Sequence, residues 1–404
     1  MHPPAASETI LKRRALTTRV RERLAIDRWP VAEERLPSGT ALVGGAIRDA
    51  LLDRLPERPD LDLVVPRDAL ALTRSLSHEL GGSCVVLDEE RDIARLVLRG
   101  WTIDIARQEG ATLEDDLLRR DYRVNAIALP LQGDHDLVDP TGGINDLTEG
   151  RLMAVSEGNL RNDPLRLLRG LRLIAEIALV LEPTTAAWIK GLRHHLPSAA
   201  PERILAELQK LVAGPQADLA IDKLLALDLL APWAASEPLP SQQDAAAMTT
   251  NERRLALPLA RLTGLISDQG LEQLRASRAL QQRCRRLRSW RQSIPDDPET
   301  LGERDRLQLQ LDLEADLPAL ILQLSRPLQQ RWLNRWRDFD DPLFHPRFPV
   351  DGNTLIKQLQ LSPGPQIGTL LAHLRQEAAF GRIEGQGAAL AEAQRWWSET
   401  RAAL

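Results

Sequence analysis

The chain has few of the features that mark secreted or membrane-spanning proteins. Its 404 residues include only two cysteines, Cys84 and Cys284, far apart in the sequence. This argues against structural disulfides or a cysteine-based zinc site and favours a reducing compartment. No run of about eighteen apolar residues occurs, and the N-terminus, arginine-rich from Lys12 to Arg23, has no apolar signal segment. These absences predict a cytoplasmic protein without a membrane partner.

Aromatic residues and excess charge are also scarce. One tyrosine and four phenylalanines accompany nine tryptophans. In a leucine-rich background, these tryptophans are more typical of helix packing than of base stacking. The 57 acidic residues outnumber the 52 basic ones, which gives a net charge of −5. Any nucleic-acid surface must therefore be a local basic patch.

Two segments in close succession carry the most specific chemical signal. Gly44 and Gly45 stand between a short apolar run and an expected helix, and Asp60 and Asp62 follow at a strand-like run. The glycines let backbone N–H groups approach a phosphate closely, and Arg48 in the helix can add charge-assisted hydrogen bonds. The two aspartates share one strand face. Such a pair can hold two Mg²⁺ ions for phosphoryl transfer.

Each segment has a plainer interpretation when taken alone, because paired glycines before a helix are common and Asp-x-Asp is usually a solvated loop. Their order along the chain favours function. Together with Asp49 the segments resemble the nucleotidyltransferase signature of bacterial tRNA CCA-adding enzymes and poly(A) polymerases. A third carboxylate, Asp104, lies in a further strand-like run. It is a candidate to complete the metal site or to polarise the attacking hydroxyl, although a single strand aspartate is a weak signal.

The segment that ends at Asn125 resembles the Arg-Arg-Asp-Phe-x-x-Asn-Ala motif of this family, with Tyr122 in place of phenylalanine. A guanidinium can lie near phosphates, a carboxylate can accept from a ribose 2′-hydroxyl, and an amide can both donate and accept. The resemblance implies nucleotide binding by Arg120, Asp121 and Asn125. Taken alone, the same residues would read as the charged start of a strand.

A second motif begins at Asn162. Asp163 is expected to cap a helix with Pro164 at its first position, and Arg166 shares the helix face of Asp163. A carboxylate beside a guanidinium fits the base edges of cytosine and adenine and rejects uracil and guanine. The segment resembles the family's Glu-Asp-x-x-Arg motif, with asparagine in place of glutamate. The resemblance implies base selection by Asp163 and Arg166 and nucleotide binding by Arg169, whereas alone the motif would be a capped helix with an ion pair.

The stretch between Glu109 and Asp116 is short, with only residues 110–115. Many CCA-adding members of the family have a flexible loop with basic and aromatic residues there, which is thought to switch the pocket from C to A. CC-adding members resemble this chain in lacking it. The resemblance therefore implies CC addition, with complete CCA addition, A-only addition and poly(A) tailing as alternatives.

The hydrophobic pattern changes from mixed to helical along the chain. Strand-like and helical runs alternate up to about residue 140, and leucines recur at helical spacing from about Asn162. The expected strands are Ala41–Val43, Leu61–Val65, Cys84–Leu87, Ala94–Leu98, Thr102–Ala106 and Ala126–Leu131, and the expected helices between them are Ala46–Leu52 and Arg67–Leu80. With the resemblance, this predicts an α+β protein with a small mixed-sheet, polymerase-β-like nucleotidyltransferase head and an all-helical neck, body and tail. The expected bounds are 1–30 for an N-terminal helical extension, 31–140 for the head, 141–215 for the neck, 216–335 for the body and 336–404 for a tail that contacts tRNA.

The resemblance implies a Mg²⁺-dependent tRNA nucleotidyltransferase that works without a nucleic-acid template. It would add CMP from CTP, with ATP as a further candidate substrate, to the tRNA 3′ end and release pyrophosphate. Asp60 and Asp62 would hold the metal and act in catalysis with Asp104. DNA is not an expected partner. A non-catalytic RNA-binding relative is the alternative from another class, and the intact Asp60 and Asp62 pair argues against it.

Overall fold

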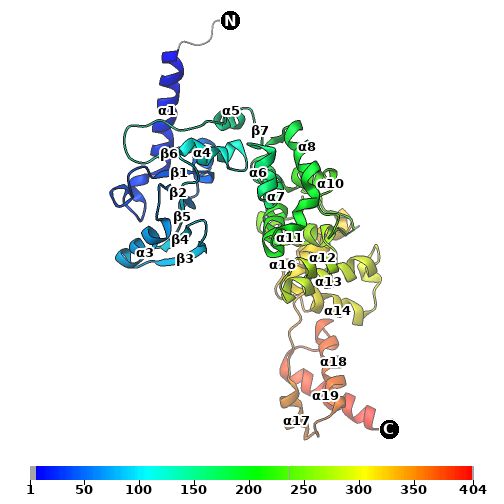
Figure 1. Cartoon of the computed structure of the whole chain (residues 1–404). Coiled ribbons are helices and arrows are strands. Elements are labelled where there is room, and N and C mark those ends of the chain that lie inside the picture. The colour runs from blue at the N-terminus through cyan, green and yellow to red at the C-terminus, as the bar shows by residue number, and fades with distance from the viewer. Residues whose placement is uncertain (1–5, 236, 403–404) are drawn as a thin grey trace. The chain divides into compact units, whose positions relative to one another are not determined.

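The computed structural model describes residues 6–235 and 237–402, which form two compact units (Figure 1). The first unit extends to Ala200 and includes Pro215–Leu229, and the second comprises Pro201–Gly214 and the chain from Leu230 onward. The domain bounds expected from the sequence within these units stay a prediction. Among the described residues, no helix is both long and apolar enough to cross a membrane.

The first unit contains a six-stranded mixed sheet with the strand order β3-β4-β5-β2-β1-β6. Its strands are β1 (Ala41–Val43), β2 (Leu61–Val65), β3 (Ser83–Asp88), β4 (Ile93–Leu98), β5 (Trp101–Arg107) and β6 (Ala128–Pro130). Strands β2 and β5 pair in parallel, and the other four pairings are antiparallel. The predicted mixed-sheet head is therefore confirmed.

Helices pack against this sheet and continue beyond it within the first unit. The α-helices are α1 (Ala6–Leu24), α2 (Gly45–Leu51), α3 (Ala69–Leu80), α4 (Leu113–Leu118), α5 (Gly143–Thr148), α6 (Glu157–Asn162), α7 (Leu165–Ile177), α8 (Pro183–Leu192) and α10 (Ala217–Ala226). The 3-10 helices are η1 (Ile26–Arg28), η2 (Glu33–Arg35), η3 (Arg123–Asn125) and η4 (Arg193–Ser198), and a small parallel pair is formed by β7 (Arg151–Leu152) and β8 (Val180–Leu181). Helix α3 packs against β3, β4 and β5, and α10 packs against α7.

The second unit is built from helices. They are α9 (Pro201–Ala213), α11 (Thr250–Leu265), α12 (Asp268–Gln273), α13 (Arg278–Ser293), α14 (Glu303–Leu313), α15 (Leu317–Ile321), α16 (Arg326–Arg337), α17 (Gly352–Leu359), α18 (Pro365–Ala379) and α19 (Gly385–Ala402), with the 3-10 helices η5 (Pro298–Thr300) and η6 (Glu314–Asp316). Trp233 and Trp332 are buried in this unit, and Trp332 meets the Phe344 ring edge-on. These contacts agree with a packing role for tryptophan, and the helical character of the chain after the sheet is confirmed.

Some local bounds differ from those expected. The run Ala126–Leu131 was expected to be one strand, but β6 covers only three of its residues. The first residue of the run, Ala126, instead forms the C-terminal cap of the 3-10 helix η3. The turn forms because the N–H of Ala126 donates to the carbonyl of Arg123. Helix α3 begins at Ala69 because Asp68 has a left-handed backbone, with φ of 59°. Strands β7 and β8 were missed, since two residues are too short for a periodic signal.

A close contact joins α7 to the segment before the sheet's last strand. The side chain of Tyr122 is fully buried, and its hydroxyl donates to the carbonyl oxygen of Arg166 at 2.8 Å. Gly170 lies on α7 against the same ring, where a Cβ would overlap the tyrosine hydroxyl. Glycine is therefore required at this position by space rather than by backbone conformation.

We expect the variant G170A to lower the free energy of unfolding by about 1–3 kcal/mol, because the added methyl group overpacks against Tyr122. Urea denaturation of the full chain measures this change. The matched control is G191A in α8, where nothing lies within 4 Å of a Cβ. There the better helix propensity of alanine should stabilise by about 0.5–1 kcal/mol. A G170A protein as stable as the wild type would contradict the assigned contact.

Candidate active site

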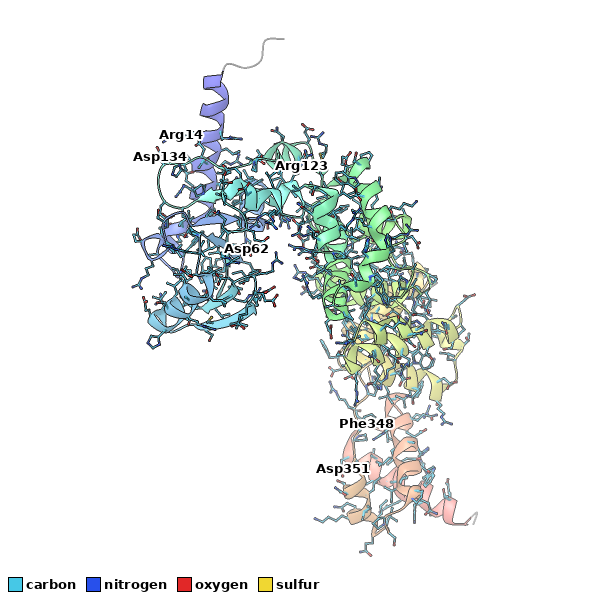
Figure 2. The ribbon with its side chains drawn as sticks, viewed as in Figure 1. Arg14, Asp62, Arg123, Asp134, Phe348 and Asp351 are labelled. Atoms are coloured by element: carbon cyan, nitrogen blue, oxygen red, sulfur yellow. The ribbon has the colours of Figure 1, made fainter. Side chains whose placement is uncertain are left out.

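One row of paired residues crosses the sheet and includes two of the predicted carboxylates. The strand register pairs Val43 with Asp62, Asp62 with Asp104, and Asp104 with Arg95. Residues paired in this way project from the same face of a sheet. The residues that alternate with them are buried: Leu61, Leu63, Ile103, Ile105 and Leu96. The charged row therefore occupies the less covered face, and Asp62, its central carboxylate, is labelled in Figure 2.

The three predicted catalytic carboxylates differ in their surroundings. Asp60 is exposed just before β2, and Asp62 is half-buried on that strand. Asp104 is the neighbour of Asp62 on β5, as the sequence suggested for a third carboxylate. Both of its oxygens are engaged by Arg95, which donates from Nε at 2.7 Å and from Nη2 at 2.9 Å.

Electrostatics at Asp62 favour a bound cation. Burial raises the pKa of Asp62 to about 6, the carboxylates of Asp104 and Asp60 raise it too, and the attraction of Arg120 and Arg169 opposes the rise. A positive ion beside Asp62 would relieve both the burial cost and the crowding of negative charge.

The donors also fit the predicted Mg²⁺. Asp60 and Asp62 supply the hard carboxylate oxygens that this ion prefers. No group of three or more His, Cys, Asp or Glu side chains able to hold a metal occurs in the part of the chain that the structure describes. Mg²⁺ is usually held by one or two carboxylates together with waters and substrate phosphates. A two-carboxylate site therefore suits a cation that arrives with a nucleotide.

Gly44 brings the phosphate-binding candidates next to Asp62. Its φ is 78°, and a Cβ there would lie 3.5 Å from Asp62 Oδ2 and 3.7 Å from Arg120 Nη1. Arg120 donates from Nε and Nη2 to Asp116 Oδ2, at 3.2 and 2.9 Å. These bonds hold the guanidinium with Nη1 towards Gly44, so a positive charge and an accessible backbone lie beside the carboxylate.

Arg48 is placed differently from the other candidates. Its side chain is buried, and its Nη1 donates to Asn125 Oδ1 at 2.9 Å. Nε and Nη2 donate to the two oxygens of Asp49, each at 3.0 Å. A Cβ at Gly45 would lie 3.7 Å from Arg48 Nη2. The geometry makes Arg48 a brace for Asn125, and its role towards phosphate stays a prediction.

Asp121 connects this network to α7. Its Oδ1 accepts from the backbone N–H of Tyr122 at 2.7 Å and from Asn125 Nδ2 at 3.4 Å. Its Oδ2 lies 3.3 Å from Arg169 Nε. Burial alone would raise the pKa of Asp121, but Arg169 and the Tyr122 N–H together hold it below its usual range. Asp121 is therefore an anion, and its ion pair with Arg169 connects α7 to the segment before η3.

The base-selecting candidates lie at the start of α7. Pro164 occupies the N-cap position of α7, which was predicted for Asp163, and so lies one residue before its expected place at the first helical position. Asp163 Oδ1 still accepts from the N–H of Leu165 at 3.2 Å. Such one-residue shifts are common at helix ends. Arg166 Nη1 donates to the carbonyl oxygens of Arg119 and Asn159, at 2.9 and 3.1 Å. These two backbone carbonyls thus fix the orientation of the Arg166 guanidinium.

Sequence reasoning missed three residues that shape this region: Arg95, Asn159 and Gly170. Asn159 Nδ2 donates to the carbonyls of Leu118 and Arg120, at 2.8 and 2.7 Å, which connects the segment before Asp121 to α6. Gly170 had a readable signal, since it is a lone glycine in a leucine-rich helix. Arg95 and Asn159 had none, because their partners come from other elements.

The predicted tRNA-contacting tail contains a hollow of about 400 Å³ that includes Phe348, Asp351 and Arg375 in its lining. Phe348 and Asp351 are labelled in Figure 2. The Arg375 guanidinium lies 4.4 Å from the centre of the Phe348 ring. Asp351 caps α17 by accepting from the N–H of Thr354 at 2.7 Å. These groups could face an RNA backbone, but tRNA contact by the tail stays a prediction.

Two family models match the chain. The model of the poly(A) polymerase head domain matches residues 40–153. That of the probable RNA and SrmB-binding site of polymerase A matches residues 179–234. The first match contains the sheet together with the carboxylate row, Gly44 and Asp121.

Similar proteins carry related names. The CC-adding tRNA nucleotidyltransferase of Synechocystis sp. is 32% identical over 397 residues, covering 89% of this chain and 94% of the relative. The A-adding tRNA nucleotidyltransferase of Deinococcus radiodurans is 43% identical over 201 residues, covering 48% and 44%. The solved CCA-adding enzyme of Bacillus stearothermophilus in complex with CTP superposes with a TM-score of 0.68, at 20% identity, over 100% of both chains. The last likeness establishes a shared fold.

Proposed function

The chain belongs to the tRNA nucleotidyltransferase and poly(A) polymerase family of enzymes, and from this premise we propose that it adds CMP from CTP to the 3′ end of tRNA and stops after two additions. The observation that carries the transferase part is Asp62 held beside Gly44 and Arg120 on an open sheet face. This arrangement places a cation-binding carboxylate, an accessible backbone and a fixed guanidinium around one point.

The residues have separate roles in the proposed transfer. Asp60 and Asp62 would hold Mg²⁺, which supplies Lewis-acid activation of the attacking hydroxyl and neutralises the leaving pyrophosphate. Arg120 binds the triphosphate next to Gly44. Asp121 is proposed to accept from a ribose hydroxyl, the role that the family motif implies, once nucleotide binding uncovers its Oδ2, which is buried here beside Arg169.

Base selection is proposed for Asp163 and Arg166. The carboxylate accepts from the exocyclic amine of cytosine, and the guanidinium donates to the neighbouring ring nitrogen. Arg166 is suited to this task because the carbonyls of Arg119 and Asn159 hold its guanidinium in one orientation. A fixed donor discriminates better than a mobile one, since it cannot adapt to the reversed edge of uracil.

The limit of two additions rests on the segment that precedes and begins α4. Asp115 Oδ2 accepts from the N–H groups of Ala111 and Thr112, at 3.1 and 2.9 Å, and Thr112 Oγ1 accepts from the Asp115 N–H at 3.1 Å. Gly110 packs against Asp115, where a Cβ would clash with the aspartate side chain. The segment is a tight, internally bonded turn, which supports the proposal that it does not reorganise the pocket for a purine.

We expect the full chain, given CTP and ATP, to extend tRNA lacking its last three nucleotides by two cytidines. On tRNA lacking only the terminal adenosine, it should add AMP poorly or not at all. Sequencing gels with each of the four nucleoside triphosphates measure this. Ready conversion of tRNA ending in CC to CCA would replace the proposal with complete CCA or A addition. Long adenosine tails would indicate a poly(A) polymerase instead.

A further inference from the structure

The ion pair between Arg95 and Asp104 is unusual for its position. Arg95 on β4 donates to both oxygens of Asp104, at 2.7 and 2.9 Å, so the carboxylate is fully engaged by one bidentate partner. Asp104 is the strand neighbour of Asp62. Asp104 therefore lies beside the proposed cation site, but both of its oxygens are occupied by Arg95.

The surroundings allow Arg95 to leave Asp104. The arginine side chain is 42% exposed, compared with 26% for the aspartate, so its movement opens no core. Its pairing neighbour on β3 is Val85, which is 48% exposed and offers no competing charge. The negative groups that attract Arg95 are Asp104, Asp60 and Asp62. Arg95 thus balances the charge of Asp104 in this row, whereas Arg120 and Arg169 act on Asp62.

We propose that Arg95 competes with the divalent cation for Asp104, so that Asp104 joins the cation site only after Arg95 releases it. This inference rests on the proposed function, because it concerns the same cation. Asp62 and Asp104 are direct neighbours on paired strands, yet no group of three metal-binding side chains occurs among the described residues. Engagement of Asp104 by Arg95 explains this difference. Arg95 is a positioning residue, since it acts through the carboxylate of Asp104.

A purely structural pair would behave differently. An exposed ion pair contributes little to stability, and its loss should leave cation binding unchanged. If Arg95 only held Asp104 in a useful orientation, its loss should weaken cation binding. Competition predicts tighter binding when the guanidinium is removed, and it predicts that this gain requires the carboxylate of Asp104.

The test measures Mn²⁺ binding to the full chain without nucleotide, from the loss of the electron paramagnetic resonance signal of free Mn²⁺. The R95Q variant should bind Mn²⁺ at least about fivefold more tightly, because a cation of like charge a few ångströms away has been removed. The R95K variant should lie between R95Q and the wild type, since lysine keeps the charge but loses the bidentate geometry. The matched control R35Q removes one charge from the exposed Arg35 and Glu79 pair of the same unit and should bind as the wild type does.

A double variant shows whether the effect passes through Asp104. R95Q/D104N should lose the gain of R95Q, and a gain that persists would overturn competition in favour of a long-range charge effect. Unchanged or weaker binding by R95Q, with unfolding curves that show a folded protein, also overturns the inference. The proposed function fails separately, if the wild type transfers no CMP. It survives failure of this inference if the wild type transfers CMP and D62N loses Mn²⁺ binding while R95Q matches the wild type.

Discussion

The D62N variant is expected to lose at least about 10³-fold in kcat/KM for CMP transfer to tRNA. Asp62 is the carboxylate that lies beside Gly44 and Arg120, where the triphosphate is proposed to bind. An amide of the same shape removes one of the two negative charges proposed to bind the cation, so less positive charge is held beside the triphosphate. Steady-state kinetics with CTP and tRNA lacking its last three nucleotides measure the loss.

The same variant should be no less stable than the wild type. Burial disfavours the charged form of Asp62, as its raised pKa indicates, and asparagine avoids that cost. Loss of activity without loss of stability is typical of a residue retained for function. The matched control is D53N, at an exposed aspartate paired with Arg23, which should keep full activity. A D62N enzyme with near-normal turnover would place the metal elsewhere.

Short-range signals predicted the local parts of this site well. Strands β1 and β2 have the bounds expected for Ala41–Val43 and Leu61–Val65, because each is a mainly apolar run bounded by polar residues, glycine or proline. Helix α2 begins at Gly45, one residue before its expected start. The close approach of Gly44 to Asp62 follows from the antiparallel pairing of β1 with β2, which places Val43 opposite Asp62.

Pairings between distant segments could be predicted only in part. The hypothesis that Asp104 neighbours Asp62 depended on which strands pair, and the sequence left that open. Parallel pairing of β2 and β5 settles it, with β3 and β4 inserted between them along the chain. The ion pair with Arg95 then follows from the antiparallel pairing of β4 with β5. No local pattern marks Arg95 among the many arginines of the chain.

Contacts to backbone carbonyls were the least predictable. Arg166 was expected to share a helix face with Asp163, but its hydrogen bonds to the carbonyls of Arg119 and Asn159 were not predicted. Every residue has a carbonyl, so the sequence contains no signal for such a bond. The contact of Tyr122 with the carbonyl of Arg166 is of the same kind. These bonds fix the start of α7, where base selection is proposed.

The proposed choice of base depends on the chemistry of one side chain, the carboxylate of Asp163. In the D163N variant, Oδ1 can still accept from the N–H of Leu165, so the start of α7 is preserved. The new amide can donate to O4 of uracil, where the carboxylate repels it. The preference for CTP over UTP in kcat/KM should therefore fall by about 5- to 150-fold, the equivalent of about 1–3 kcal/mol for one base-edge contact. Affinity for the triphosphate should change little, and E157Q, which makes the same acid-to-amide change on α6, should leave the preference intact. An unchanged CTP to UTP ratio in an active D163N enzyme would reduce Asp163 to a helix cap.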